Sequence, residues 1–84
     1  METSKFKQLL DDQITWPDYY TFKFIIKSDK KHQVIELLSD HQIIEKPSKN
    51  GKYTSINSRK IINSSDEVLE IYERINKIEG VIKL

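Results

Sequence analysis

The segment from Tyr20 to Lys27 has a large aromatic or aliphatic side chain at every even position. The residues between them are Thr21, Lys23, Ile25 and Lys27. Because successive side chains of a strand point to opposite faces, this period of two predicts a strand with one buried face and one face in water. The rest of the chain must therefore supply a cover for one side of a sheet.

Two later segments have helical spacing. A helix from about Lys30 to Asp40 is indicated by an apolar stripe, and either Ser28 or Asp29 suits its N-cap. That stripe consists of Val34, Leu37, Leu38 and His41. A second helix is predicted from about Ser65 to Lys77, because Ser64 and Glu67 have the spacing of a capping box and Gly80 suits the position just past its end. Its apolar face holds Val68, Leu69, Ile71, Tyr72 and Ile75.

Three further strands complete the pattern. Residues 43–47 form a strand that Pro47 restricts to a sheet edge, since proline cannot donate a ladder hydrogen bond. Asn50-Gly51 then predicts a type I′ hairpin turn into an antiparallel strand over residues 52–62. Alternation along that strand sends Ser58 and Lys60 inward, so we expect a bulge or fray at residues 58–60 rather than Lys60 reaching out at the strand end. A short last strand covers residues 81–84.

The order β-α-β-β-α-β predicts an α+β fold, the ferredoxin-like sandwich. In this fold a four-stranded antiparallel sheet carries both helices on one face, with the first and third strands at the centre. We expect residues 20–84 to form this single domain. Residues 1–19 are interpreted as an appended N-terminal arm with a short helical turn, since Phe6, Leu9 and Leu10 have helical spacing before the break at Trp16-Pro17.

Length and composition exclude several classes of protein. An 84-residue chain has room for one domain, and without cysteine it forms no disulfide, thiolate nucleophile or thiolate metal site. It has no run of about 20 apolar residues, which a membrane-spanning helix requires, and its first residues lack the apolar core of a secretory signal. We expect a cytoplasmic protein with no membrane contact.

No catalytic or metal-binding set stands out. His32, Glu36 and Asp40 share a helix face, but the apolar stripe points elsewhere, so we interpret them as a solvated face. His41 is expected to neutralise the C-terminal dipole of its helix. The two glycines are each explained by a turn or a cap, which leaves no phosphate-binding loop. We therefore expect no enzyme activity, no cofactor and no metal.

Charge is distributed unevenly along the chain. Lys46, Lys49, Lys52, Arg59 and Lys60 occur without an acidic residue between them, whereas the last helix is acidic. With cations of the first strand, they predict a basic open sheet face and hairpin. The candidate interaction surface is Lys23, Lys27, Lys49, Lys52, Tyr53, Asn57 and Arg59. Such lysines also protect sheet edges against aggregation; as a docking surface they suit an anionic ligand, an acidic protein or single-stranded nucleic acid.

Three segments together resemble the YbeD-like family of small bacterial proteins. They are Trp16-Pro17-Asp18-Tyr19-Tyr20-Thr21-Phe22-Lys23, the hairpin Lys46 to Ile56 with its Gly51-x-Tyr53-x-Ser55 motif, and Ile71 to Ile75 with Val81 to Leu84. The resemblance implies a fold similar to amino-acid-sensing ACT domains and no established molecular function; some members carry a label linking them to lipoate metabolism. Ile26 replaces a glycine that often ends the first strand, which counts against amino-acid binding.

The leading functional hypothesis is a non-enzymatic regulatory or protein-interaction module. Its partner is either another protein or a second copy of the chain, bound through sheet edges or the open face. The alternative is a regulatory domain that binds an amino acid or anion near the loop after the first strand, and a nucleic-acid-binding module ranks third.

Overall fold

The alternating segment forms β1 (Asp18–Lys27), one of the two central strands of a four-stranded sheet. The structure is a computed structural model and describes residues 3–84. The alternation predicted for β1 is confirmed, since Phe22, Phe24 and Ile26 are completely buried while Lys23 and Lys27 are exposed. One face of β1 therefore carries the core, and the other faces water.

The sheet has the order β2-β3-β1-β4, and every neighbouring pair is antiparallel. Its other strands are β2 (Gln42–Pro47), β3 (Tyr53–Ile62) and β4 (Ile82–Lys83). Pro47 ends the edge strand β2, as predicted. The order of elements and strands confirms the α+β, ferredoxin-like fold.

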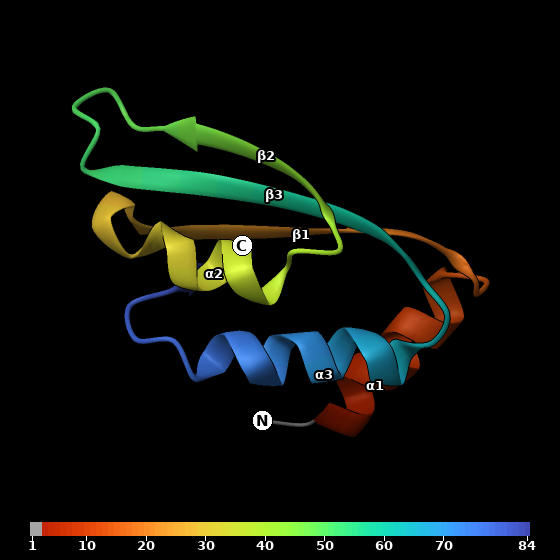
Figure 1. Cartoon of the computed structure of the whole chain (residues 1–84). Coiled ribbons are helices and arrows are strands. Elements are labelled where there is room, and N and C mark those ends of the chain that lie inside the picture. Colours follow the sequence, from red (N-terminus) through yellow and green to blue (C-terminus); the bar gives the residue numbers. More distant parts are fainter. Residues whose placement is uncertain (1–2) are drawn as a thin grey trace.

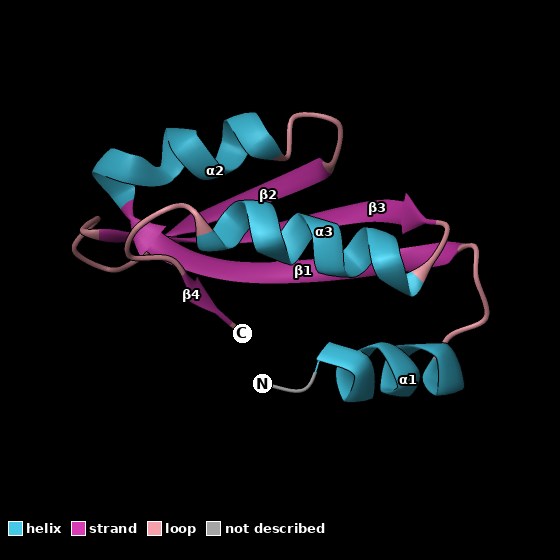
Figure 2. Ribbon diagram, turned by 90° about the horizontal axis from the view of Figure 1, so that it is seen from below, coloured by secondary structure: helices cyan, strands magenta, loops and turns pink. Residues whose placement is uncertain are grey.

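Helices cover one face of this sheet, and no described element covers the other (Figures 1 and 2). The covering helices are the short 3₁₀ helix η1 (Ser28–Lys30), α2 (Lys31–Leu37) and α3 (Ser65–Asn76). None of the helices in residues 3–84 is long and apolar enough to cross a membrane.

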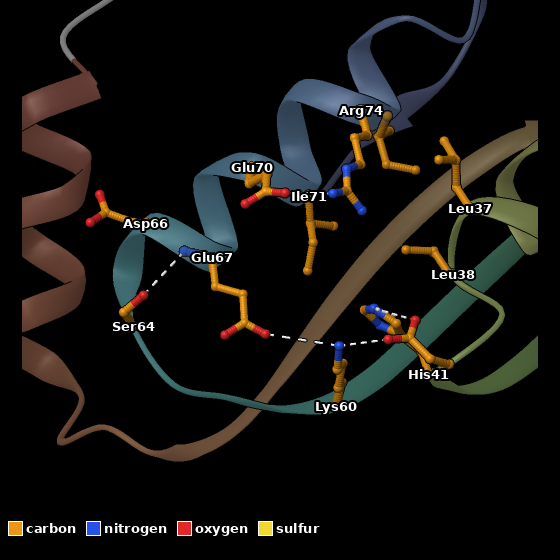
Figure 3. A pocket seen from close by; sticks show the side chains of 12 residues that line it. Leu37, Leu38, His41, Lys60, Ser64, Asp66, Glu67, Glu70, Ile71 and Arg74 are labelled. Atoms are coloured by element: carbon orange, nitrogen blue, oxygen red, sulfur yellow. Dashed lines mark hydrogen bonds and ion pairs between the residues drawn. The ribbon is translucent and has the colours of Figure 1, made fainter.

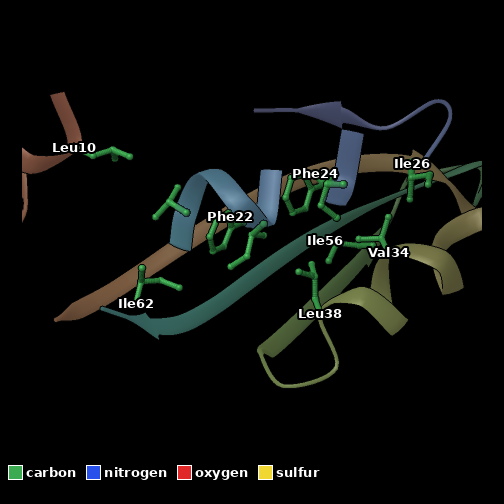
Figure 4. Close-up of a cluster of buried hydrophobic side chains, with 11 residues drawn as sticks. Leu10, Phe22, Phe24, Ile26, Val34, Leu38, Ile56 and Ile62 are labelled. Carbon is green, nitrogen blue, oxygen red and sulfur yellow. The ribbon is translucent and has the colours of Figure 1, made fainter. Parts of the chain in front are cut away.

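The core lies between the sheet and these helices (Figure 4). Phe22 is at its centre, with ring centroids of Tyr72 at 5.4 Å and of Phe24 at 6.2 Å. Full burial of such an apolar side chain contributes about 1.5–3 kcal/mol. The buried apolar residues are Leu10, Phe22, Phe24, Ile26, Val34, Leu38, Ile56, Ile62, Val68, Ile71 and Ile75.

The N-terminal segment is part of this core, which corrects the interpretation as an appended arm with a short turn. Residues Thr3–Gln13 form α1, an 11-residue helix beside α3. Leu10 is 7% exposed, and the ring of Phe6 packs edge-on against Tyr72 at 6.0 Å. An ion pair of 2.9 Å between Lys7 and Asp66 also joins the two helices. The Trp16-Pro17 peptide bond that follows α1 is cis.

The predicted start of the first helix is wrong in its capping. Neither Ser28 nor Asp29 caps η1 or α2 through its side chain. The Ser28 hydroxyl instead lies 2.7 Å from the hydroxyl of Thr54 on β3. The helix also ends at Leu37 rather than Asp40.

The β2–β3 hairpin is not the predicted type I′ turn. A type I′ turn needs positive φ at both central residues, but among the described non-glycine residues none has positive φ, and Gly51 alone in this loop does, at 73°. Residues 48–52 form a longer loop, closed by Ser48, whose N–H donates to the Tyr53 carbonyl at 2.7 Å. Asn50 stabilises it through its side-chain oxygen, which accepts the N–H of Lys52 at 3.0 Å.

The second predicted helix is confirmed, with one shifted contact. The Ser64 hydroxyl accepts the N–H of Glu67 at 3.3 Å, as in a capping box. The Glu67 carboxylate, however, accepts the N–H of Asn63 at 3.0 Å instead of that of Ser64. Gly80 has the expected positive φ of 84°, but it lies in the turn before β4, beyond the end of α3 at Asn76.

Candidate functional site

The uncovered side of the sheet is the first candidate site. Directly paired residues of antiparallel strands point to the same face, so the pairing of Lys23 with Asn57 and of Asn57 with Ile44 defines one outward row. We call the set of outward residues the open face. It consists of Tyr19, Thr21, Lys23, Ile25, Lys27, Gln42, Ile44, Lys46, Tyr53, Ser55, Asn57, Arg59, Ile61, Ile82 and Leu84.

The open face carries most of the exposed large apolar side chains. Of the seven such side chains in the described chain, six lie on this face and Leu9 on α1 is the other. Ile44 is 69% exposed and Leu84 68%. Single exposed apolar residues are ordinary on protein surfaces, whereas their collection on one face is typical of an interaction site.

Cations lie on the same face as these apolar groups, and no Asp or Glu side chain belongs to the open face. The cations are Lys23, Lys27, Lys46 and Arg59. In the described part of the chain none of the four has a carboxylate oxygen within 4.0 Å. The guanidinium carbon of Arg59 lies 3.9 Å from the centroid of the Tyr19 ring, so a cation–π contact holds this side chain over the sheet.

A polar cluster on the opposite side of β3 is the second candidate (Figure 3). Ser58 points inward and is completely buried, and its hydroxyl lies 2.5 Å from Nδ1 of His41. The His41 side chain is only 2% exposed, and its Nε2 faces Asp40 Oδ1 at 3.7 Å. Burial lowers the pKa of His41 below its ordinary value, so the neutral ring is favoured.

Lys60 completes this cluster from the end of β3. Its ammonium group lies 2.6 Å from Asp40 and 3.8 Å from Glu67, so it joins the turn after α2 to the first turn of α3 (Figure 3). The hydrogen bond from Lys60 lowers the pKa of Asp40. These contacts stabilise both inward polar residues of β3, Ser58 and Lys60. The predicted bulge or fray at residues 58–60 is wrong, because the pairing of β3 with β1 is continuous from residue 53 to residue 62.

The polar cluster borders a hollow of about 450 Å³ between the end of α2, β3 and α3. The charged side chains that line the hollow are held in ion pairs, for example Arg74 with Glu70, and Asp66 with Lys7 of α1. Ser58, His41 and Asp40 include the residue types of a hydrolase triad, but the Ser58 hydroxyl is completely buried and no substrate can reach it. The cluster therefore has the character of a structural network.

Comparison with known proteins places the chain in a family. The model of the family described as "Protein of unknown function (DUF493)" matches residues 11–84. The chain belongs to the DUF493 family. The resemblance to YbeD-like proteins is thereby confirmed, because that family is DUF493. No curated protein matches the chain.

The fold of this DUF493 chain is similar to a solved structure. The solution structure of protein HP0495 from H. pylori matches with a TM-score of 0.71 and 24% sequence identity, and the match covers 86% of each chain. At 24% sequence identity, this structural similarity supports the fold of the chain and nothing further.

The structure brings together five of the seven residues predicted for the interaction surface of the DUF493 chain. Lys23, Lys27, Tyr53, Asn57 and Arg59 all lie on the open face. The other two, Lys49 and Lys52, are exposed in the loop that joins β2 to β3 and are not part of the sheet.

Sequence reasoning missed the exposed apolar side chains of the open face, with the exception of Tyr53. Ile44 and Lys46 alternate with Ile43 and Glu45 along β2, but only the pairing with β3 decides which set faces outward. Tyr19 was assigned to the segment before the strand, although β1 begins one residue earlier, at Asp18. The other two apolar members, Ile82 and Leu84, fall in the predicted last strand at residues 81–84.

The structure also tests the predictions made for the two histidines and for the loop after β1. His41 does not serve the helix dipole, because its ring is buried, bound to Ser58 and favoured in the neutral form. His32 and Glu36 are exposed on α2, in agreement with a solvated helix face. The loop after β1 was the predicted place for an amino acid or anion. It lines neither the hollow of about 450 Å³ beside Lys60 nor a second hollow of about 590 Å³ between α1, α3 and β4.

Proposed function

We propose that this chain is a non-enzymatic, cytoplasmic interaction module that binds another protein through the open face. The observation that carries the proposal is the collection of exposed apolar side chains on one uncovered side of the sheet. Binding there removes this apolar surface from water, which favours association. A regulatory role follows if the partner's activity depends on this contact.

Protection of sheet edges is the competing explanation for the lysines, and it does not account for this arrangement. Edge protection places charges on edge strands, and Lys46 on β2 fits that role. Lys23 and Arg59, however, lie on β1 and β3, the two central strands. Edge protection also gives no reason for exposed Ile61 and Tyr19 on those strands.

A photo-crosslinking experiment in cells that produce the chain tests the proposal. A photoreactive amino acid replaces Asn57 at the middle of the open face, and the matched control replaces His32 on the exposed side of α2. We expect a discrete protein adduct from position 57 and none from position 32. The adduct should disappear when Ile44→Ser and Ile61→Ser remove two of the exposed apolar groups.

Two results contradict the proposal. One is the absence of any protein adduct at position 57. The other is an adduct of equal yield at both positions, because it reports random collisions rather than a specific face.

A further inference from the structure

None of the cations of the open face has a carboxylate partner among the described residues, although several cations on the helix-covered side do. Lys31, Lys60 and Arg74 on the covered side each contact a carboxylate at 2.9 Å or less. No carboxylate of the described chain lies within 4.0 Å of a cation on the open face, although the chain carries 13 acidic residues. The positive charge on this face is thus left for a partner.

Arg59 is the cation best prepared to receive a carboxylate. The Tyr19 ring holds its guanidinium group in place at 3.9 Å, which reduces the freedom lost on binding. A cation–π contact uses the flat face of the guanidinium, so the N–H groups at its edge stay free for a bidentate bond to a carboxylate. Lys23 lies diagonally across from Arg59 on β1, and Lys46 lies further along the same face, opposite Ser55.

From these observations, and resting on the proposed function, we infer that the partner is a protein surface in which carboxylates alternate with apolar side chains. The carboxylates contact Arg59 and the open-face lysines, and the apolar groups contact Ile44, Ile61 and Ile82. Such a mixed surface is complementary to the open face in both charge and hydropathy.

The apolar content of the open face favours a protein over a single-stranded nucleic acid. Nucleic acids bind open sheets by stacking bases on aromatic rings. Here four of the six exposed large apolar side chains are aliphatic. Of the two aromatic rings, that of Tyr19 is covered by Arg59, which leaves Tyr53 at one end of the sheet.

A second copy of the chain also fits poorly. If two open faces met symmetrically, the cations of both copies would lie in one interface without any Asp or Glu side chain from either face. Like charges placed opposite one another oppose association. The face-to-face homodimer included among the sequence hypotheses is thus less favourable than an acidic partner.

Titration of the intact, ¹⁵N-labelled chain with synthetic polymers tests this inference by NMR. The probes are a random copolymer of glutamate and tyrosine, polyglutamate, polylysine and an oligothymidylate. We expect the copolymer to bind most tightly, polyglutamate and the oligothymidylate more weakly, and polylysine not at the open face. The amide shifts caused by the copolymer should lie on β1, β2 and β3.

Charge removal supplies the matched comparison. Each of Lys23→Gln and Arg59→Gln should weaken copolymer binding about two- to fivefold, the range that corresponds to a surface ion pair. Arg74→Gln is the control, because this cation lies on α3 and is already paired with Glu70; it should leave copolymer binding unchanged. The amide spectrum of each variant reports whether the fold is retained.

Three outcomes overturn the inference: tighter binding of the oligothymidylate than of the copolymer, copolymer shifts confined to α2 and α3, or equal effects of Arg59→Gln and Arg74→Gln. Its failure is distinct from failure of the proposed function. If position 57 forms a protein adduct in cells but the copolymer does not bind, the docking role stands and the acidic partner is rejected. If no adduct forms, the docking role itself is rejected.

Discussion

Removal of the Ser58 hydroxyl is the sharpest test of how the interior of this fold tolerates polar residues. In the described chain, this hydroxyl is the one hydrogen-bond partner of His41 Nδ1. Ser58→Ala leaves that nitrogen buried without a partner, because the His41 side chain is 2% exposed and cannot turn to water without opening the core. An unsatisfied buried polar group costs about 1–3 kcal/mol.

Urea unfolding followed by far-ultraviolet circular dichroism measures this cost. Each kcal/mol also lowers the thermal midpoint of a domain of this size by roughly 4–8 °C. Ser55→Ala is the matched control, since Ser55 lies on the same strand but points outward and makes only a long 3.4 Å contact with the Lys46 carbonyl. We expect that variant to stay within about 0.5 kcal/mol of the unchanged chain.

A double variant separates the hydrogen bond from simple packing. Replacing both partners by apolar groups removes the need for the hydrogen bond, so His41→Leu with Ser58→Ala should be less destabilised than the sum of the single variants. The reasoning is refuted if Ser58→Ala unfolds at the same urea concentration as Ser55→Ala. It is also refuted if the two single effects simply add.

Three further outcomes follow from the structure. Burial lowers the pKa of His41 from its ordinary value of 6.5, so just below pH 6.5 the unfolded chain binds more protons than the folded one. The free energy of unfolding should therefore fall as the pH is lowered from 6.5. In urea titrations, His41→Leu should make this pH dependence weaker. Leu10→Ala should cost about 2–5 kcal/mol, as for a core leucine, whereas Leu9→Ala, at a 56% exposed neighbour, should cost little; equal costs would restore the appended-arm interpretation. Gly51→Ala should lower the thermal midpoint through a backbone penalty of about 1–2 kcal/mol, because φ is 73° with open space around the position, and Gly51→Asn should lower it less.

The sheet and its main helix were predictable because their signals are local. The alternation around Phe22 assigns the buried face of β1, and the Ser64 and Glu67 spacing marks the start of α3. Pro47 likewise assigned β2 to an edge. Each of these features depends on residues only a few positions apart.

The errors arose where distant residues decide the outcome. A buried serine at position 58 suggested a broken strand. The ring of His41, in the turn between α2 and β2, is the hydrogen-bond partner of that serine, and Lys60 pairs with Asp40 in the same turn and with Glu67 on α3. The N-terminal helix looked separate because the contact of Phe6 with Tyr72 spans most of the chain.

The sequence predicted the cations of the open face but not most of its apolar side chains, again because distant residues decide which side chains lie together. Arg59 belongs to a run of cations without acidic residues, and Lys23 lies on the water-facing side of the predicted first strand, so both could be predicted. The apolar members of the open face come from all four strands, and the outward position of Ile44 and Ile82 follows only from the strand register. The chemical character of the face, basic and apolar together, thus became visible only with the sheet assembled.

The most direct test of the central claim is the acylation rate of individual lysines, compared between the purified chain and the lysate of cells that produce it. Lys23 and Lys46 report the open face, while the exposed Lys5 and Lys77 lie on the helix side of the same molecule and serve as internal controls. A partner bound to the open face should slow acylation of Lys23 and Lys46 in the lysate and leave the two controls unchanged. Equal rates at Lys23 and Lys46 in both samples would contradict the account, because the open face would then be as free in the cell extract as in the isolated protein.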